Sequence, residues 1–427
     1  TARGFWIHHL MPPATIAWLD AALQGGRLED ARALVSGDLD DWPFREGQHA
    51  GRFEVDARIA DATLKFQPDW PAAEHVDARV AFVADGFHLD GKGTLAGVGI
   101  RSLRAGIDHF GTAVLEVAAQ GGGDAARLLA LLRQSPLHAR YGETLDGLDA
   151  SGLASVTFGM ELPLHAGAGP GDITGTVALA GVDLADRPRE LAFQDVRGRA
   201  TYDEAGFVAE RLAVRHEGQP GTLSLRAGDG TRDTAQAFEA ELRANLDAGR
   251  LLDRVEALDW LQPRIHGRSA WVARLAVPRD GGAARLRLSS DLAGTALALP
   301  APLAKPGGIG LATRIETALP AGSGDVTVSL GERMALRARG GGVPAVRVTL
   351  GSGDVPSRTP EPGLAIEGRT GTLDALGWVG LARDAARDAP GAGPDGQASP
   401  GLELRAVDVT ASRLRLLDTN FADTRVQ

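Results

Sequence analysis

Period-two alternation of apolar and polar residues is the feature that most limits how this chain can fold. Between Phe53 and Ile59 every second residue is apolar, and the residues between them are Glu54, Asp56 and Arg58. Side chains alternate between the two faces of a strand, so this segment predicts a strand with one apolar face. One-sided strands are typical of antiparallel sheets, because parallel sheets are covered on both faces. We therefore predict a mainly β, antiparallel fold.

The same alternation recurs along the chain. Its apolar positions, which are the candidate site residues, are Phe53, Val55, Val76, Val80, Phe82, Phe87, Leu89, Val156, Phe158, Met160, Leu162, Leu223, Leu225, Phe238, Leu242, Leu286 and Leu288. The apolar faces of so many strands must be covered. Either sheets pack on one another, or the faces line a groove that holds an apolar ligand. The residues alone leave both arrangements open and favour packed sheets, which are the commoner.

Three short helical patterns interrupt the strands, each behind a residue that can cap a helix. They follow Asp124, Asp247 and Thr372, so their starts lie 123 and 125 residues apart. This spacing predicts strand-rich repeats that each end in a short helix. The predicted division is a helix and first strands over 1–61, repeat modules over 62–136, 137–263 and 264–385, and a loop and the start of a further module over 386–427.

Charge and cysteine content exclude several classes of function. The 45 basic and 55 acidic residues give a net charge of −10, the wrong sign for a protein that binds nucleic acid through phosphates. Cysteine is absent, which excludes disulfides, thiolate nucleophiles and cysteine-ligated metals. No apolar run is long enough to span a membrane as a helix. The chain opens at Thr1 without a signal sequence, so we expect any signal or anchor to precede it.

Catalytic motifs are missing from the sequence. It contains no phosphate-binding Gly-rich loop ending in Lys-Ser/Thr, no Gly-x-Ser-x-Gly and no His-Glu-x-x-His. His8 and His9 are adjacent, and adjacent residues on a strand point to opposite faces. Asp38, Asp40 and Asp41 form the densest acidic cluster, but the Gly and Glu of a calcium loop are missing there. We expect a solvated turn at this cluster, no cofactor, no metal site and no enzyme activity.

Short motifs spread over nearly the whole chain suggest a family. They include Trp18-Leu19, Asp41-Trp42-Pro43-Phe44, Pro68-Asp69-Trp70-Pro71, Ser135-Pro136-Leu137, Gly267-Arg268-Ser269-Ala270-Trp271 and Leu299-Pro300-Ala301-Pro302-Leu303 with Lys305. Together they resemble the central region of the YhdP family of AsmA-like proteins. The resemblance implies a long, twisted antiparallel sheet, curved into a U-shaped apolar groove with a few short helices at its edges.

The resemblance also implies a function. Such proteins are similar to bridge-like lipid carriers in the periplasm of Gram-negative bacteria, which carry phospholipids between the inner and outer membranes. An N-terminal helix outside this chain would supply the inner-membrane anchor. The expected partners are therefore phospholipids and, through segments outside the chain, the two membranes. The resemblance raises the groove above packed sheets.

Two other functions remain open. A structural or protein-binding β scaffold of the cell envelope would use the same strands in packed sheets, without lipid. A carbohydrate-active enzyme would need a cleft lined by aromatic side chains and a pair of carboxylates. Aromatic residues are only 5% of the chain, which counts against the enzyme.

Overall fold

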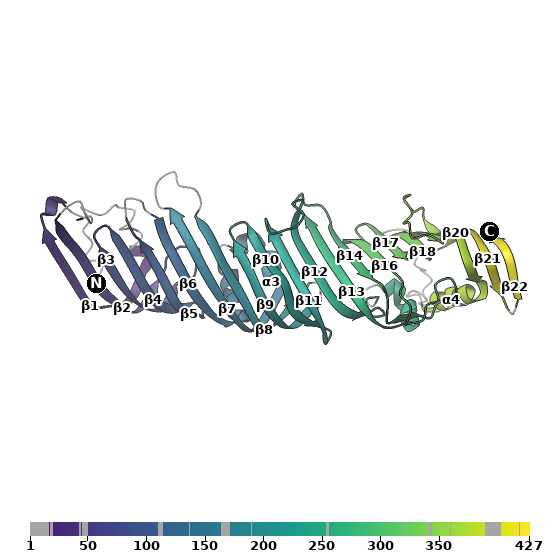
Figure 1. Cartoon of the computed structure of the whole chain (residues 1–427), viewed down its shortest axis with the longest axis horizontal. Coiled ribbons are helices and arrows are strands. Elements are labelled where there is room, and N and C mark those ends of the chain that lie inside the picture. The colour runs from purple at the N-terminus through teal and green to yellow at the C-terminus, as the bar shows by residue number, and fades with distance from the viewer. Residues whose placement is uncertain are drawn as a thin grey trace, which may run out of the picture. The chain divides into compact units, whose positions relative to one another are not determined.

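The computed structural model describes residues 17, 20–41, 44, 50–109, 114–135, 137–163, 171–188, 190–252, 256–320, 322–340, 344–358, 360–388, 403–417 and 419–427. The chain divides into two compact units, residues 1–218 and 219–427, which we call unit 1 and unit 2. Both are built mainly of β-strands, so the predicted mainly β fold is confirmed (Figure 1).

The described residues of unit 1 form a meander of ten strands, in which each strand pairs antiparallel with the next. The strands are β1 (Leu23–Gly37), β2 (Gly51–Leu64), β3 (Ala73–Val83), β4 (Gly86–Leu95), β5 (Val98–Ile107), β6 (Val114–Asp124), β7 (Leu148–Pro163), β8 (Asp172–Asp186), β9 (Leu191–Asp203) and β10 (Gly206–His216). The short helix η2 (Leu39–Asp41) follows β1.

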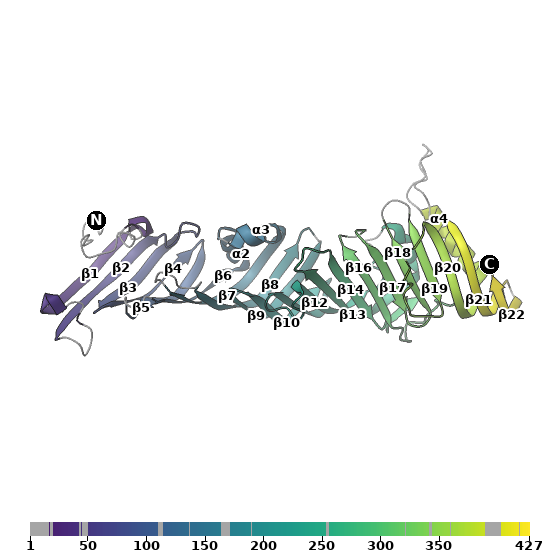
Figure 2. The same cartoon turned by 90° about the horizontal axis from the view of Figure 1, so that it is seen from above.

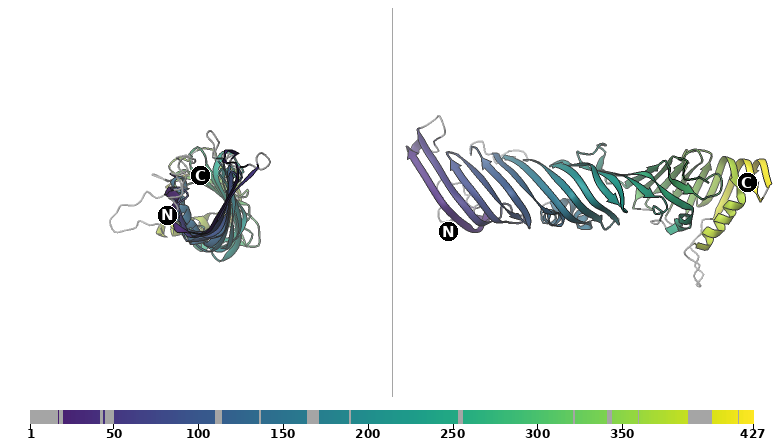
Figure 3. Two further views of the ribbon diagram at one scale, coloured as in Figure 1. Left: turned by 90° about the vertical axis from the view of Figure 1, so that its left-hand side faces the viewer. Right: turned by 60° about the horizontal axis from the view of Figure 1, so that its bottom comes forward.

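β-Bulges bend the sheet of unit 1. Asp61, His75, Asp195 and Arg211 have left-handed backbone angles, with φ between 49° and 52°. Each lies where the pairing register shifts by extra residues. A bulge bends its strand and increases the local twist. The purple and blue strands of this unit accordingly curve in the end-on view of Figure 3.

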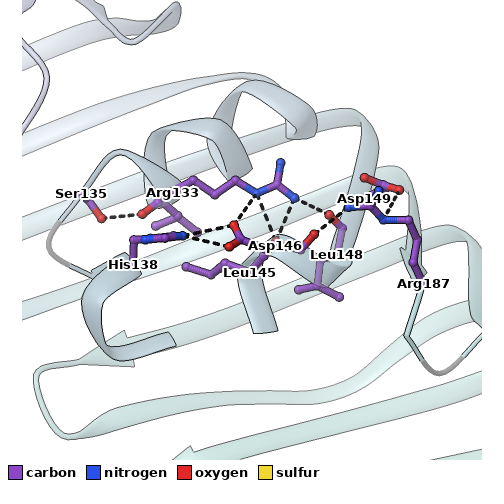
Figure 4. Close-up of polar contacts among 9 residues, drawn as sticks. Arg133, Ser135, His138, Leu145, Asp146, Leu148, Asp149 and Arg187 are labelled. Carbon is purple, nitrogen blue, oxygen red and sulfur yellow. Dashed lines mark hydrogen bonds and ion pairs between the residues drawn. The ribbon is translucent and has the colours of Figure 1, made fainter. Parts of the chain in front are cut away.

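A helical excursion of 23 residues joins β6 to β7, although the two strands pair directly. It contains α2 (Ala125–Arg133) and α3 (Leu137–Gly147), which contact one another and β7 (Figure 2). Asp124 caps α2 as predicted, because its Oδ1 accepts a hydrogen bond from Ala126 N at 2.8 Å. Arg133 then ties the helix ends together by donating to the carbonyls of Leu145 and Leu148 (Figure 4).

Unit 2 contains twelve strands among its described residues. They are β11 (Gln219–Gly228), β12 (Gln236–Asp247), β13 (Ile265–Pro278), β14 (Ala284–Ser290), β15 (Thr295–Leu297), β16 (Thr313–Leu319), β17 (Asp325–Leu330), β18 (Met334–Arg339), β19 (Ala345–Leu350), β20 (Gly363–Asp374), β21 (Leu404–Leu416) and β22 (Thr419–Val426). From β11 to β19 and from β21 to β22 the pairing is antiparallel and follows chain order, except that β14 pairs with β16 and β15 pairs with β13.

Two pairings in unit 2 differ from the predicted antiparallel order. β19 pairs parallel with β20, and β20 pairs parallel with β21. Parallel neighbours need a crossover of about a dozen residues or more. Residues 351–362 supply the first crossover, and the segment that contains α4 (Ala375–Asp388) supplies the second.

The helices of unit 2 depart from the predicted positions. The segment after Asp247 forms turns and then the 3₁₀ helix η3 (Glu256–Arg264), whose Pro263 is incompatible with an α-helix interior. The third helix begins at Ala375, directly after Asp374, rather than after Thr372. Gly377 N donates to Asp374 Oδ1 at 2.9 Å, so Asp374 takes the capping role predicted for Thr372. Most of the residues ahead of β1, where the helix predicted within 1–61 would lie, and residues 389–402 of the loop predicted within 386–427 are outside the described residues.

Candidate functional site

The apolar side chains of unit 1 lie on one face of its sheet. Residues opposite one another in paired strands share a face, so the pairing registers trace rows across the strands. One row runs through Ala57, Val80, Leu89, Ala105, Val117, Met160 and Ile173. The next runs through Ile59, Ala78, Gly91, Leu103, Ala119, Phe158, Gly175, Tyr202 and Phe207. Apolar surface is therefore continuous from β2 to β10.

The registers bring all the predicted residues of unit 1 onto this face. Val55 lies opposite Phe82, which lies opposite Phe87, and the two phenyl rings are 5.9 Å apart. The strand pairings place four further predicted residues on the same face: Phe53, Val76, Val156 and Leu162. Most of the predicted positions are only partly buried, so the face is not closed by a second sheet layer among the described residues.

Sequence reasoning missed the contribution of β5 and β6 to this face. Leu103, Ala105, Val117 and Ala119 complete the rows between the predicted residues of β4 and β7. These strands also alternate in the sequence, but their alanine and glycine residues make the contrast between apolar and polar positions weak. Ala105 and Ala119 are the small members of these rows, and Ala119 lies directly opposite Phe158.

The opposite face of unit 1 is polar. Its rows include Asp56, Ala81, His88, Gly106, Glu116, Glu161 and Asp172, and next to it Asp90, Arg104, Ala118, Gly159, Thr174 and Asp203. A depression of about 780 Å³ is lined mainly by these two rows. Small Gly106, Ala118 and Gly159 hollow it, and carboxylates surround them. This depression does not match an acyl chain, so the candidate site for an apolar ligand is the other face.

Unit 2 repeats the arrangement. Its central row runs through Leu223, Leu242, Ala273, Leu288, Ile315, Val328, Leu336, Val348, Ile366 and Val407. On one side of it, Leu225, Ala240, Leu275 and Leu286 form a shorter row that continues the predicted positions. Phe238 lies on the same face, opposite Ala227 and Val277.

The other side of the central row is covered. This edge row runs through Ala244, Trp271, Ser290, Thr313, Leu330, Met334, Leu350, Gly368 and Val409. Trp271, Met334, Leu350 and Val409 are 2% to 8% exposed, whereas every central-row residue from Leu242 to Val407 is only partly buried. The apolar face of unit 2 therefore has a covered half and a more open half.

Ion pairs hold the polar face of unit 2. Glu241, next to Leu242 on β12, accepts hydrogen bonds from Arg243 and Arg274, both at 2.7 Å. Burial of the carboxyl opposes ionisation, but the two guanidinium groups outweigh it and lower the pKa of Glu241. Asp325 on β17 is held in the same way by Arg339 and Arg337, which lower its pKa. Charge and apolar surface thus stay on opposite faces.

The acidic residues weighed for catalysis lie at the short helix η2. Asp38 directly precedes this helix, and its Oδ1 accepts a hydrogen bond from Asp40 N at 3.1 Å. In the described ranges, His, Asp and Glu side chains do not gather in threes that could hold a metal ion. His8 and His9 lie outside those ranges. None of the described helices has the length and apolarity of a membrane span.

Comparison with known proteins identifies the family. The family described as YhdP protein matches residues 7–427. The intermembrane phospholipid transporter YhdP of Escherichia coli (strain K12) is 26% identical over 324 residues, which are 74% of this chain and 24% of that protein. The chain thus spans about a quarter of the length of that relative. No solved structure matches the chain. With a family match over nearly its whole length, the chain belongs to the YhdP protein family.

Proposed function

We propose that this chain is a segment of a lipid-transfer protein whose apolar sheet faces carry the acyl chains of phospholipids. The observation that carries the proposal is the continuity of the apolar rows, which cross up to ten successive strands while many of their side chains stay partly exposed. A face of this kind is a surface for an elongated apolar ligand. The polar rows on the other face of unit 1 stay in water.

Binding on such a face needs no specific contact. Each buried methylene contributes roughly 0.8 kcal/mol, so affinity accumulates along the length of an acyl chain. Rows of aliphatic side chains offer similar surroundings at successive strands, so moving along the face costs an acyl chain little. The short side chains of Ala105 on β5 and Ala119 on β6 would give an acyl chain room beside Phe158 and Met160. The groove formed by the curved sheet is part of this proposal.

The relative supports the setting. It is named an intermembrane phospholipid transporter and comes from Escherichia coli (strain K12). We infer that this segment acts in the periplasm, on phospholipids that pass between the inner and outer membranes. Attachment to the membranes would be made by parts of a longer protein outside residues 1–427. No catalytic role is proposed.

Bound lipid is the direct test. The chain is purified without detergent from a Gram-negative host, and phospholipid in its organic extract is quantified by mass spectrometry against an unrelated β-rich protein. Phe158→Asp puts a charge on the apolar face, and Thr157→Asp puts the same charge on the neighbouring exposed position of the other face. We expect Phe158→Asp to reduce bound phospholipid at least tenfold and Thr157→Asp to leave it within twofold of the parent.

The scaffold hypothesis gives a different result. If the face were closed against another layer, Phe158→Asp would bury an unpaired charge and cost several kcal/mol of stability. The thermal unfolding of both variants is therefore measured in parallel. A folded Phe158→Asp variant with unchanged phospholipid content would overturn the proposed function, and an unfolded one with a lipid-free parent would favour the scaffold.

A further inference from the structure

The connection between β14 and β16 is far longer than the sheet requires. The two strands pair directly, with Ser290 opposite Thr313, so a turn of a few residues could join them. Residues 291–312 instead turn away from β14, form the short strand β15, which pairs with β13, and then return to β16. We call this segment the strap. The strap is not needed to connect β14 to β16 in the sheet. We therefore ask which surface its apolar residues cover.

The strap covers the edge row of unit 2 with its own side chains. Leu292, Leu297 and Leu311 form one buried cluster with Ala244 and Trp271. Leu303 forms another with Met334, Leu350 and Val409. These strap residues are 3% to 7% exposed. The strap therefore covers the edge row. Central-row residues such as Leu288 and Leu336 pack against these two clusters from the side and are only partly buried.

Polar bonds fix the strap in this place. The ammonium of Lys305, 2% exposed, donates to the carbonyls of Leu292, Thr295, Pro306 and Ile309 at 2.5 to 3.1 Å. Burial lowers the pKa of this amine from its ordinary value. Strap residues Leu297 and Lys305 also pair backbone to backbone, at 2.8 and 3.0 Å.

The strap is also bonded to the rest of unit 2. Thr295 Oγ1 donates to Ser269 Oγ on β13 at 3.0 Å, where both side chains are buried. Ala298 N donates to Arg264 O at 2.7 Å, and Trp378 Nε1 on α4 donates to Ala301 O at 2.9 Å. The contacts lie on three separate elements, so displacing the strap would break all of them together.

We propose that the strap is a fixed wall that closes the edge row of unit 2 to lipid and confines acyl chains to the central row and the shorter row beside it. This inference rests on the proposed function and specifies where on unit 2 that function acts. The leucines of the strap take the place that acyl chains would otherwise fill. Leu336 and Met334, two residues apart on the same face of β18, fall on opposite sides of this boundary.

The test uses the unmodified chain and vesicles of phosphatidylethanolamine that carries a diazirine in one acyl chain. After irradiation, adducts are located by peptide mass spectrometry. We expect adducts at Phe158 in unit 1 and at Leu288 and Leu336 in unit 2, at least tenfold above those at Met334 and Leu350. Equal labelling of Leu336 and Met334 would overturn the wall. Labelling at neither Phe158 nor Leu336 would count against the proposed function instead.

A variant without the strap tests its role directly. Residues 291–312 are replaced by Asn-Gly, which favours a tight turn between paired strands. With strand content and cooperative unfolding retained, we expect labelling of Met334 and Leu350 to rise to the level of Leu336. A folded variant in which Met334 stays unlabelled would overturn the inference.

A disulfide that locks the strap in place tests the same point without removing the strap. It decides the question even if the Asn-Gly replacement does not fold. The chain has no cysteine, so the pair Ser269→Cys on β13 and Thr295→Cys on the strap can form a single disulfide that joins the strap to β13. The matched control, Thr157→Cys with Thr176→Cys, joins directly opposed residues of β7 and β8. A fixed wall predicts that oxidising either pair leaves labelling of Leu336 unchanged. Loss of that labelling in the oxidised strap pair alone would show that the strap must move, and would overturn the wall.

Discussion

The phenol of Tyr202 on β9 donates a hydrogen bond to the main-chain carbonyl of Thr157 on β7, at 3.1 Å. To reach it, the ring crosses Gly175 on the intervening β8. A Cβ at Gly175 would lie 2.3 Å from the phenol Cζ and Oη, so only glycine leaves room for the ring. Tyr202 thus bridges three strands of unit 1 and covers a glycine of the apolar row.

Substitutions at this bridge should have unequal costs. Tyr202→Phe keeps the ring and loses one hydrogen bond, so we expect unit 1 to lose about 1 kcal/mol of stability. Gly175→Ala displaces the ring altogether, and we expect at least about 2 kcal/mol. Urea unfolding followed by circular dichroism measures both. Equal costs would mean that the ring already lies away from Gly175 in solution.

Alkaline pH should weaken unit 1 through the same residue. Burial raises the pKa of Tyr202 above its ordinary value of 10.0, because the phenolate is poorly solvated there. A group with a raised folded pKa contributes stability that is present below the unfolded pKa and lost as pH rises above it. We therefore expect the melting temperature of the parent to fall more steeply above pH 10 than that of Tyr202→Phe. Phenolate absorbance in Tyr141→Phe, which leaves one tyrosine, should report the delayed titration.

The fold class could be predicted because the alternation of apolar and polar residues in a one-sided strand is visible in the sequence of that strand alone. Phe53 to Ile59 and Val156 to Leu162 alternate without interruption, and the structure has β2 and β7 there. The cap at Asp124 is equally local. Parallel pairing of β20 could not be predicted, because it depends on how residues 351–362 cross over rather than on any pattern in the strand itself. Division of the chain into three repeat modules stays a prediction.

The sequence indicates which residues of a strand share its apolar face, but not where the continuous apolar face begins and ends, and lipid contact at these residues stays a prediction. Registers align Val80, Leu89 and Met160 in one row, and the sequence indicates only that each faces one side of its own strand. Bulges such as that at Asp195 shift the register and have no clear sequence signal. The covered half of unit 2 was missed for a similar reason. Leu297 and Leu303 look like strand or loop residues until the fold brings them over Trp271 and Met334.

Acid should weaken unit 2 through Asp325. Hydrogen bonds from Arg339 and Arg337, at 2.7 and 3.1 Å, lower the pKa of this carboxyl below its ordinary 3.8. A lowered folded pKa contributes stability that is present above the unfolded pKa and lost as pH falls through the folded one. We expect Asp325→Asn to lower the melting temperature of unit 2 at pH 6, with the difference from the parent shrinking below pH 3.8. A difference that is constant with pH would assign the effect to packing.

The cap of α2 should matter locally. Asp124 accepts from Ala126 N at 2.8 Å and from Gly152 N at 3.4 Å, so it joins the start of the helix to β7. Asp124→Ala should cost about 1 kcal/mol, typical of a lost cap, and Asp124→Asn should cost less because an amide oxygen can still accept. Hydrogen exchange should show faster exchange at residues 125–133 in Asp124→Ala, while β2 to β4 stay unchanged.

The ammonium of Lys305 should be the most costly side chain of the strap to remove. Lys305→Met keeps the length and apolar stem but removes the donor to four carbonyls. A buried carbonyl that loses its partner costs about 1–3 kcal/mol, so we expect unit 2 to lose at least about 3 kcal/mol. Lys305→Arg cannot restore the loss, because a planar guanidinium does not match carbonyls that surround a compact ammonium. Differential scanning calorimetry of both variants, with the exposed Lys92→Met as control, measures the effect. A Lys305→Met variant within about 1 kcal/mol of the parent would mean that the strap is held by its leucines alone.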